Sequence, residues 1–259
     1  MRRFNTLNFG GRREDGTTPY RLGDQDLSLF FGQSSFSQYV VTRASNAVVV
    51  DPDVDLTLLG PLGCGIQTGS GTVLNRLKPV VGESLVVFGC GAVGLSAIMA
   101  AKLTGCSQII AVDIHASRLA LAGELGATHQ INGKEQDAVA VIKQITGKGA
   151  HYAVETTGVS AIVLQAVHAV KPLGTVAIVG FTGDITLNVQ NDLMAEGKSL
   201  VGVIEGDAVP ALFIPLLVQL YKQGKFPIDK LIARYPLADI NQAFADSASG
   251  KVIKPVVVM

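Results

Sequence analysis

A glycine-rich segment between an apolar run and a helical pattern constrains the fold of this chain more than any other feature. The segment reads VVFGCGAVG, and Gly89, Gly91 and Gly94 form the pattern GxGxxG within it. After a strand, the first glycine allows a tight turn, the second lets the backbone approach a pyrophosphate, and the third permits close helix–strand packing. The free N–H groups of the following helix would face the phosphates. The pattern is weak alone, but in this context it predicts a dinucleotide site.

Short apolar runs alternate with helical patterns from Ser84 onward, as in the βαβ units of a parallel sheet. Helices are expected over 92–104, 116–125, 135–146 and 159–170, and a glycine follows each of the first three, as is typical of helix ends. The expected strands are SLVVFG, QIIAVD, ATHQIN, AHYAVET, GTVAIVG and KSLVGVI. These six strands and their crossovers predict an α/β fold with a doubly wound parallel sheet of the Rossmann type.

A carboxylate at the end of the second expected strand strengthens the dinucleotide interpretation. Asp113 lies about 20 residues after the last glycine of the motif, where it can accept hydrogen bonds from ribose hydroxyls. A 2′-phosphate would meet like charge there, so Asp113 favours NAD over NADP; the alternative is that it caps the next helix. Arg118 either reaches the same ribose or is a solvated helix residue. Cys90, inside the motif, is most simply a small buried side chain.

The composition excludes several classes of partner. Among 259 residues, 21 basic and 21 acidic side chains cancel, which indicates neither a nucleic-acid-binding nor an anionic-membrane-binding surface. A small-molecule partner is therefore expected. No apolar stretch is long enough to span a bilayer, so the expected location is the cytoplasm. Three cysteines without close pairing indicate reduced thiols rather than a disulfide framework.

The flanking segments predict a second, smaller layer. Residues 35–50 have the pattern of two strands joined by a turn near Ser45, as in an antiparallel or barrel-like sheet. The C-terminal part predicts a helix over 208–223, a short helix near 238–246 and a final strand, IKPVVVM. Pro215 is expected to disturb the first of these helices or to lie in an early turn.

One more segment, GPLGCGIQTG, precedes the expected sheet and contains a lone thiol among glycines. It could be a plain connector, because glycine tolerates sharp turns. On the residues alone, Cys64 is either a buried structural thiol or a thiolate carried to a site.

Taken together, SSFSQYVV, GPLGCGIQTG, VFGCGAVGLSAIMAAKL, VETTG, LKPLGTVAIVGF and YPLADINQAFADSASGKVIKPVV resemble the zinc-dependent medium-chain alcohol dehydrogenases. The resemblance is to the aryl- or benzyl-alcohol type and runs essentially from end to end. It implies a partial GroES-like catalytic domain over 1–63, an NAD-binding domain over 64–204 and a return to the catalytic domain over 205–259. Substrate would bind in the cleft between the two domains.

The resemblance also implies roles for individual residues. Cys64 matches the second cysteine ligand of the catalytic zinc, and Thr68, expected on the same loop, matches a threonine beside the nicotinamide. Lys254 matches an arginine that contacts the pyrophosphate, although a solvated lysine is an equal alternative. The full set of expected coenzyme contacts is Gly89, Gly91, Val93, Gly94, Asp113, Ile114, Arg118, Thr157, Gly158, Gly180, Ile204 and Lys254.

The resemblance begins partway through the first domain of the family, and the other zinc ligands have no counterpart here. His115, His129, His151 and His168 all lie in the nucleotide-binding part and are expected to be surface residues rather than metal ligands. A single thiolate cannot hold zinc, which needs three protein ligands and an open position. We therefore expect the chain to bind zinc poorly and to be inactive as it stands.

The expected function is NAD-dependent oxidation of a primary aromatic or allylic alcohol to the aldehyde, with hydride transfer assisted by zinc. Two alternatives remain at this point: a zinc-free reductase of the same superfamily, and a non-catalytic NAD-binding module. The resemblance further implies a homodimer or homotetramer joined along the edge strand KSLVGVI, although an ordinary buried strand explains that run equally well.

Overall fold

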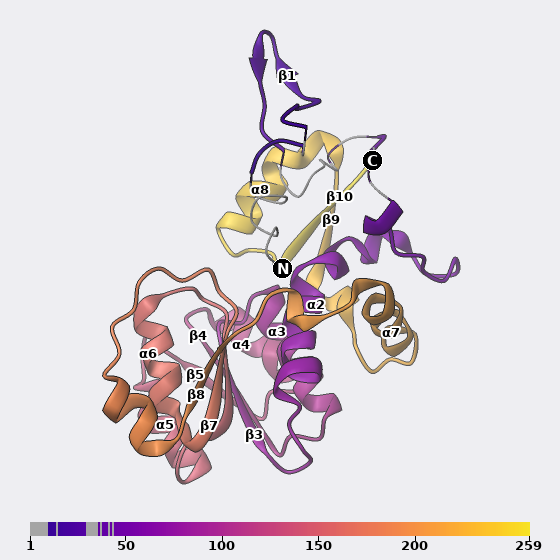
Figure 1. Cartoon of the computed structure of the whole chain (residues 1–259). Coiled ribbons are helices and arrows are strands. Elements are labelled where there is room, and N and C mark those ends of the chain that lie inside the picture. Colours follow the sequence, from indigo (N-terminus) through magenta and orange to yellow (C-terminus); the bar gives the residue numbers. More distant parts are fainter. Residues whose placement is uncertain (1–9, 14, 30–35, 37, 41, 43) are drawn as a thin grey trace.

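The structure is a computed structural model that describes residues 10–13, 15–29, 36, 38–40, 42 and 44–259. Its larger part is a sheet with helices on both faces, and its smaller part gathers the C-terminal strands around a helix, as Figure 1 shows. No helix among the described residues is both long and apolar enough to cross a membrane.

The sheet confirms all six expected strands and their doubly wound arrangement. The neighbour order is β5-β4-β3-β6-β7-β8, and every pair is parallel. Crossover connections of this kind bring the carboxyl ends of the strands to one edge of the sheet. The strands are β3 (Ser84–Phe88), β4 (Gln108–Asp113), β5 (His129–Asn132), β6 (Ala150–Glu155), β7 (Val170–Ile178) and β8 (Ser199–Gly202).

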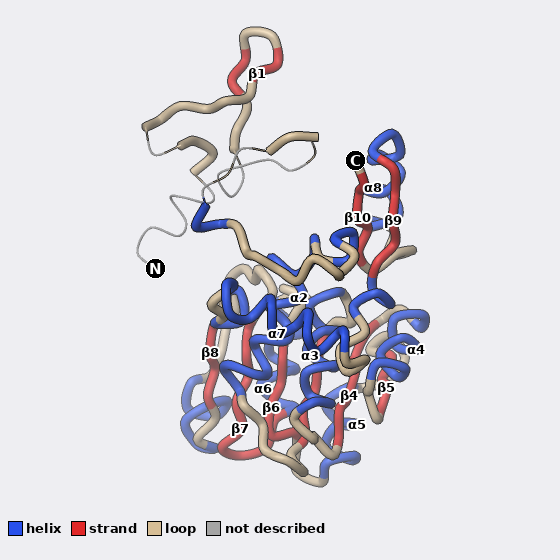
Figure 2. Tube along the Cα trace, turned by 90° about the vertical axis from the view of Figure 1, so that its right-hand side faces the viewer, coloured by secondary structure: helices blue, strands red, loops and turns tan. Residues whose placement is uncertain are grey.

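The helices between the strands cover the two faces and enclose two apolar cores (Figures 1 and 2). Alternate residues of β3 divide between them: Leu85 and Val87 join the core on the α3 and α4 face, whereas Val86 and Phe88 join the core on the α5 and α6 face. All four expected crossover helices are confirmed: α3 (Ala92–Leu103), α4 (Ala116–Leu125), α5 (Ala138–Thr146) and α6 (Ser160–Ala169).

The glycine-rich segment before the sheet is not a loop. After a 3-10 turn at Gly60–Gly63, it forms helix α2 (Gly65–Gly71), in which every residue is buried. A Cβ placed on Gly69 would lie 1.9 Å from the carbonyl oxygen of Val93, so α2 lies directly on the first turn of α3. Glycine disfavours helix by about 1 kcal/mol relative to alanine, but here close helix packing requires it. Tertiary packing therefore overrides the low helix propensity of the segment.

The C-terminal part contains α7 (Pro210–Lys222), β9 (Ile232–Pro236), α8 (Ile240–Ala248) and β10 (Lys254–Val258). β9 and β10 form a separate two-stranded parallel sheet. The three predicted elements are present. α7 begins at a proline and also contains Pro215, but it continues past that residue, so Pro215 does not end the helix.

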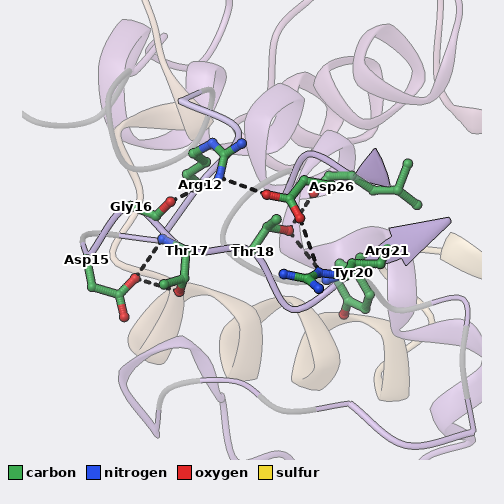
Figure 3. A network of polar contacts seen from close by, with 9 residues as sticks. Arg12, Asp15, Gly16, Thr17, Thr18, Tyr20, Arg21 and Asp26 are labelled. Carbon is green, nitrogen blue, oxygen red and sulfur yellow. Dashed lines mark hydrogen bonds and ion pairs between the residues drawn. The ribbon is translucent and has the colours of Figure 1, made fainter. Parts of the chain in front are cut away.

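A small hairpin, β1 (Arg21–Leu22) and β2 (Gln25–Asp26), stands apart from both sheets. Figure 3 shows the polar contacts that tie it to the preceding segment. Arg12 donates to the carbonyl oxygen of Gly16 at 3.1 Å, and its guanidinium lies 3.3 Å from Asp26. Asp26 also pairs with Arg21 at 3.2 Å. These exposed ion pairs fix a local shape but contribute little stability.

The two strands expected within residues 35–50 are wrong for the part that the structure describes. Residues 44–46 form a 3-10 turn, and none of 36, 38–40, 42 and 44–50 lies in a strand; residues 35, 37, 41 and 43 lie outside the described residues. An apolar run becomes a strand only where a neighbouring strand pairs with its backbone. No such neighbour is present in the described chain, and Tyr39 and Val49 are exposed.

Candidate functional site

The glycine loop has the geometry that a dinucleotide requires. Gly89 has φ of 91°, and a Cβ there would lie 2.6 Å from Oγ1 of Thr156. A Cβ on Gly94 would lie 1.8 Å from the carbonyl oxygen of Gly89, so this glycine serves close helix–strand packing. A Cβ on Gly91 would meet no atom within 4 Å. Gly91 therefore faces open space at the N-terminus of α3, where a pyrophosphate would fit.

Asp113 lies at the same edge and is oriented by backbone donors. It is 7% exposed; Oδ2 accepts from the N–H of Cys90 at 2.6 Å, and Oδ1 accepts from the N–H groups of Ile114 and His115 at 2.7 and 2.9 Å. The N-cap of α4 is His115, so the alternative role of Asp113 as helix cap is wrong. A carboxylate has about four lone-pair positions, and these three bonds leave one on Oδ2. That position suits a ribose hydroxyl.

Cys90 and Arg118 flank this carboxylate in different ways. Cys90 is fully buried, and burial followed by the Asp113 charge raises the pKa of its thiol far above the usual range, which confirms a structural side chain. Arg118 points toward the C-terminal segment, because a Cβ on Gly250 would lie 3.0 Å from its Nη2. Its Nε is buried without a hydrogen-bond partner in the described chain. The guanidinium lines a cavity of about 270 Å³ that Lys230 and Lys251 also border.

The ends of β6 and β7 form the next part of the edge. Glu155 is fully buried and accepts from the N–H of Thr157 at 2.7 Å, from its hydroxyl, and from the N–H of Gly158 at 3.2 Å. A Cβ on Gly180 would lie 2.4 Å from the nitrogen of Gly158, so the two turns are in contact. Thr157, Gly158 and Gly180 are therefore brought together as expected. Sequence reasoning missed Glu155, although a carboxylate ending an apolar strand in VETTG was a signal.

Cys64 lies near a carboxylate that sequence reasoning also missed. It ends the 3-10 turn before α2, it is exposed, and its Sγ donates to Oε1 of Glu205 at 3.9 Å. Burial and then the Glu205 charge raise the pKa of the Cys64 thiol, and the Lys254 charge opposes them. Thr68 lies in helix α2 rather than on a loop, and its hydroxyl donates to Oε2 of Glu205 at 3.3 Å.

Glu205 belongs to a left-handed turn that follows β8. Glu205, Gly206 and Asp207 have φ values of 51°, 67° and 48°. Asn75 donates from Nδ2 to the carbonyl oxygen of Gly206 at 3.0 Å, and Arg76 lies 3.5 Å from Asp207. The polar triplet EGD directly after an apolar run was the sequence signal for this turn.

The remaining expected contacts lie at two places. Val93 and Ile114 border the glycine loop and Asp113, and Ile114 is half exposed. Ile204 directly precedes the left-handed turn and is 56% exposed. Lys254 begins β10, pairs in register with Ile232, and acts electrostatically on Cys64.

The residues present do not by themselves fit a zinc ion. No group of three or more His, Cys, Asp or Glu residues that could hold a metal occurs in the described chain. Cys64 has one potential second ligand, Glu205, whereas catalytic zinc takes three protein ligands. The histidines lie elsewhere: His151 bonds Ser84, and His168 pairs with Asp192.

Comparison with known proteins places this site in a family. The profile described as "Zinc-binding dehydrogenase" matches residues 92–222. Geraniol dehydrogenase of Castellaniella defragrans is 44% identical over 260 residues, which cover 97% of this chain and 69% of that protein. The chain belongs to the zinc-binding dehydrogenase family.

Solved structures of this zinc-binding dehydrogenase family have the same fold as this chain. The alcohol dehydrogenase zinc-binding domain protein from Burkholderia ambifaria superimposes with a TM-score of 0.94 at 50% identity, covering all of this chain and 71% of that one. Benzyl alcohol dehydrogenase from Acinetobacter calcoaceticus superimposes with a TM-score of 0.91 at 48% identity, covering 98% of this chain and 70% of that one. The chain thus spans about 70% of the length of these relatives.

Proposed function

We propose that this chain binds NAD across the carboxyl edge of the six-stranded sheet and serves in the NAD-dependent oxidation of an alcohol to an aldehyde. The contrast between Gly91 and Gly94 carries the proposal: Gly94 is closed by packing, whereas Gly91 leaves open space at the helix N-terminus. The free acceptor position of Asp113 supports NAD rather than NADP, because a 2′-phosphate would be repelled there.

Each part of the edge has a role in this proposal. The N-terminus of α3 would bind the pyrophosphate, Asp113 would orient the adenosine ribose, and Thr68 would lie beside the nicotinamide. Bound NAD supplies the acceptor for a hydride from the alcohol carbon. The residues around Gly158 and Gly180 position the ring, and the apolar side chains packed around them exclude water. Because the described residues do not complete a zinc site, we expect no oxidation of alcohol by this chain alone.

The proposed substrate is a primary aromatic or allylic alcohol. Support comes from two relatives, one named for geraniol and one for benzyl alcohol. Geraniol is an allylic alcohol and benzyl alcohol an aromatic one, so both carry the reacting carbon next to a π system.

The test is coenzyme binding measured separately from turnover. We expect NADH to bind with a rise in its fluorescence and NADPH to bind more weakly by at least about tenfold, or about 1.4 kcal/mol. Equal binding of NADH and NADPH would contradict the role of Asp113. Oxidation of benzyl alcohol or geraniol by the chain alone would contradict the expected need for further metal ligands. Coenzyme binding without turnover, even with added zinc, also fits a non-catalytic NAD-binding module.

We also propose a homodimer or homotetramer in the cytoplasm, joined along β8. β8 pairs with β7 on one side and is the last strand of the described sheet. An open strand edge readily pairs with another strand. Light scattering on the chromatographed chain should give a mass of at least twice 27.1 kDa; a monomer at all concentrations would contradict this assembly.

A further inference from the structure

The left-handed turn after β8 holds a carboxylate that the dinucleotide fold alone does not need. Positive φ values are unfavourable for residues with a Cβ, yet Glu205 and Asp207 both adopt them around Gly206. Such backbone persists only where surrounding contacts impose it, and here Asn75 and Arg76 supply those contacts. The turn is thus built to hold one conformation, and the side chain of Glu205 is directed from it.

The surroundings of the Glu205 carboxylate are uncharged and rich in acceptors. Its hydrogen bonds come from the amide of Gln67 at 3.1 Å, the hydroxyl of Thr68 at 3.3 Å and the thiol of Cys64 at 3.9 Å. Glu205 is half-buried and forms no ion pair within the described chain, whereas Asp207 pairs with Arg76. Gln67 is 2% exposed, and its Oε1 has no hydrogen-bond partner among the described residues. This corner therefore carries an unpaired negative charge.

The position of Glu205 in the fold says which half of a dinucleotide it would meet. Asp113, at the end of β4, marks the adenosine side of the sheet edge. Glu205 follows β8, on the other side of the glycine loop, and shares the edge with Gly158 and Gly180. A dinucleotide lies across this edge with its two halves on opposite sides of the first strand. Glu205 therefore lies on the nicotinamide side.

We infer that Glu205 is a specificity-determining residue that favours the oxidised over the reduced nicotinamide ring. The oxidised ring carries a positive charge and the reduced ring carries none, while the rest of the coenzyme is the same. An unpaired carboxylate in a half-buried corner attracts the charged ring and leaves the neutral ring unaffected. The inference rests on the proposed NAD site and assigns a preference within it.

The experiment measures the affinities of the metal-free chain for NAD⁺, NADH and ADP-ribose by calorimetry. We expect Glu205→Gln to raise the ratio of the NAD⁺ to the NADH dissociation constant about three- to tenfold, which is the size of one charge interaction near a protein surface. ADP-ribose, which lacks the ring, should bind Glu205→Gln and the parent chain equally. Asp207→Asn is the matched control: it removes an equal charge two residues away, one already paired with Arg76, and should leave the ratio unchanged. Glu205→Asp, which keeps the charge, should retain most of the preference.

Two measurements separate this inference from the proposed function. Failure of the parent chain to bind ADP-ribose would overturn the NAD site, and the inference with it. Equal ratios in the parent and Glu205→Gln, with ADP-ribose binding intact, would overturn the inference alone. Should Glu205→Gln fail to fold, the parent chain still decides, because raising the salt concentration should narrow its preference for NAD⁺. A preference unchanged by salt would then contradict an electrostatic origin.

Discussion

Three glycines in one loop show how differently the same residue type can act. Gly89 takes up a backbone conformation, Gly94 a contact with that backbone, and Gly91 neither of these. The first two roles are satisfied inside the protein, so their loss harms folding. The role of Gly91 is satisfied only by a ligand, which makes it the residue that separates binding from stability.

Substituting these glycines by alanine should separate the two effects. We expect Gly94→Ala to lower the free energy of unfolding by about 1–3 kcal/mol, because its Cβ would overlap a backbone carbonyl. Gly91→Ala should change that free energy by less than about 0.5 kcal/mol, since its Cβ meets no protein atom. It should nevertheless weaken NADH binding by about tenfold or more, or about 1.4 kcal/mol. Urea denaturation and NADH titration measure both. An unaltered NADH affinity in Gly91→Ala would mean that the phosphates lie elsewhere.

Individual residues were predictable from sequence where local pattern determines their role. Gly89, Gly91 and Gly94 were found by their spacing, and Asp113 by its place after a strand. Glu205 was not found, because its role depends on meeting a helix that lies more than a hundred residues earlier in the chain. No local pattern encodes that meeting.

Elements were predictable where a sheet or helix buries its own apolar pattern. β3 to β8 and the helices between them were located from alternating runs and terminal glycines. The two strands expected over 35–50 failed, because the pairing partner that makes an apolar run a strand is absent from the described chain. α2 was missed for the opposite reason: its glycines disfavour helix locally, and only contact with α3 reveals why they are there.

The pairing of α8 with β9 depends on one acidic side chain and should respond to pH. Asp246 is 5% exposed and accepts from the hydroxyl of Tyr235, from Gln242 and from Lys251. The hydrogen bond from Tyr235 and then those from Lys251 and Gln242 hold the pKa of the Asp246 carboxyl below its usual range. Its stabilising contribution is thus complete above the ordinary aspartate pKa near 3.9 and is lost as pH falls through the lowered folded-state value.

We therefore expect Asp246→Asn to be less stable than the parent chain at neutral pH, with the difference shrinking below about pH 4. Thermal unfolding followed by circular dichroism across this range tests it. Asp229→Asn, at an exposed position in a turn, is the control and should match the parent throughout. A constant difference between Asp246→Asn and the parent down to the lowest pH would show that the ionised form contributes nothing.

The whole molecule combines a complete dinucleotide fold with an incomplete set of metal ligands. The six-stranded sheet has both faces covered and two cores, so it does not depend on the small β9–β10 sheet for its packing. Stability and metal chemistry are therefore separable in this chain.

Ligands should report this separation through the thermal stability of the chain. NADH at about 100 times its dissociation constant should stabilise the folded state by about 2.7 kcal/mol. Zinc at the same molar excess should add nothing, and metal analysis after dialysis should find less than one zinc per chain. Cys64→Ser serves as control, because its response to zinc should equal that of the parent. Zinc-dependent stabilisation that Cys64→Ser abolishes would reveal ligands beyond Cys64 and Glu205.

The contact between α2 and α3 has a mechanical consequence. At Gly69 backbone touches backbone, with no side chain between them to absorb a displacement. Any shift of the thiol-bearing turn must then carry the phosphate cradle with it, as two gears on one shaft turn together. A domain movement in this protein would have to bend the chain elsewhere, leaving thiol and cradle in constant relation through every cycle of coenzyme exchange.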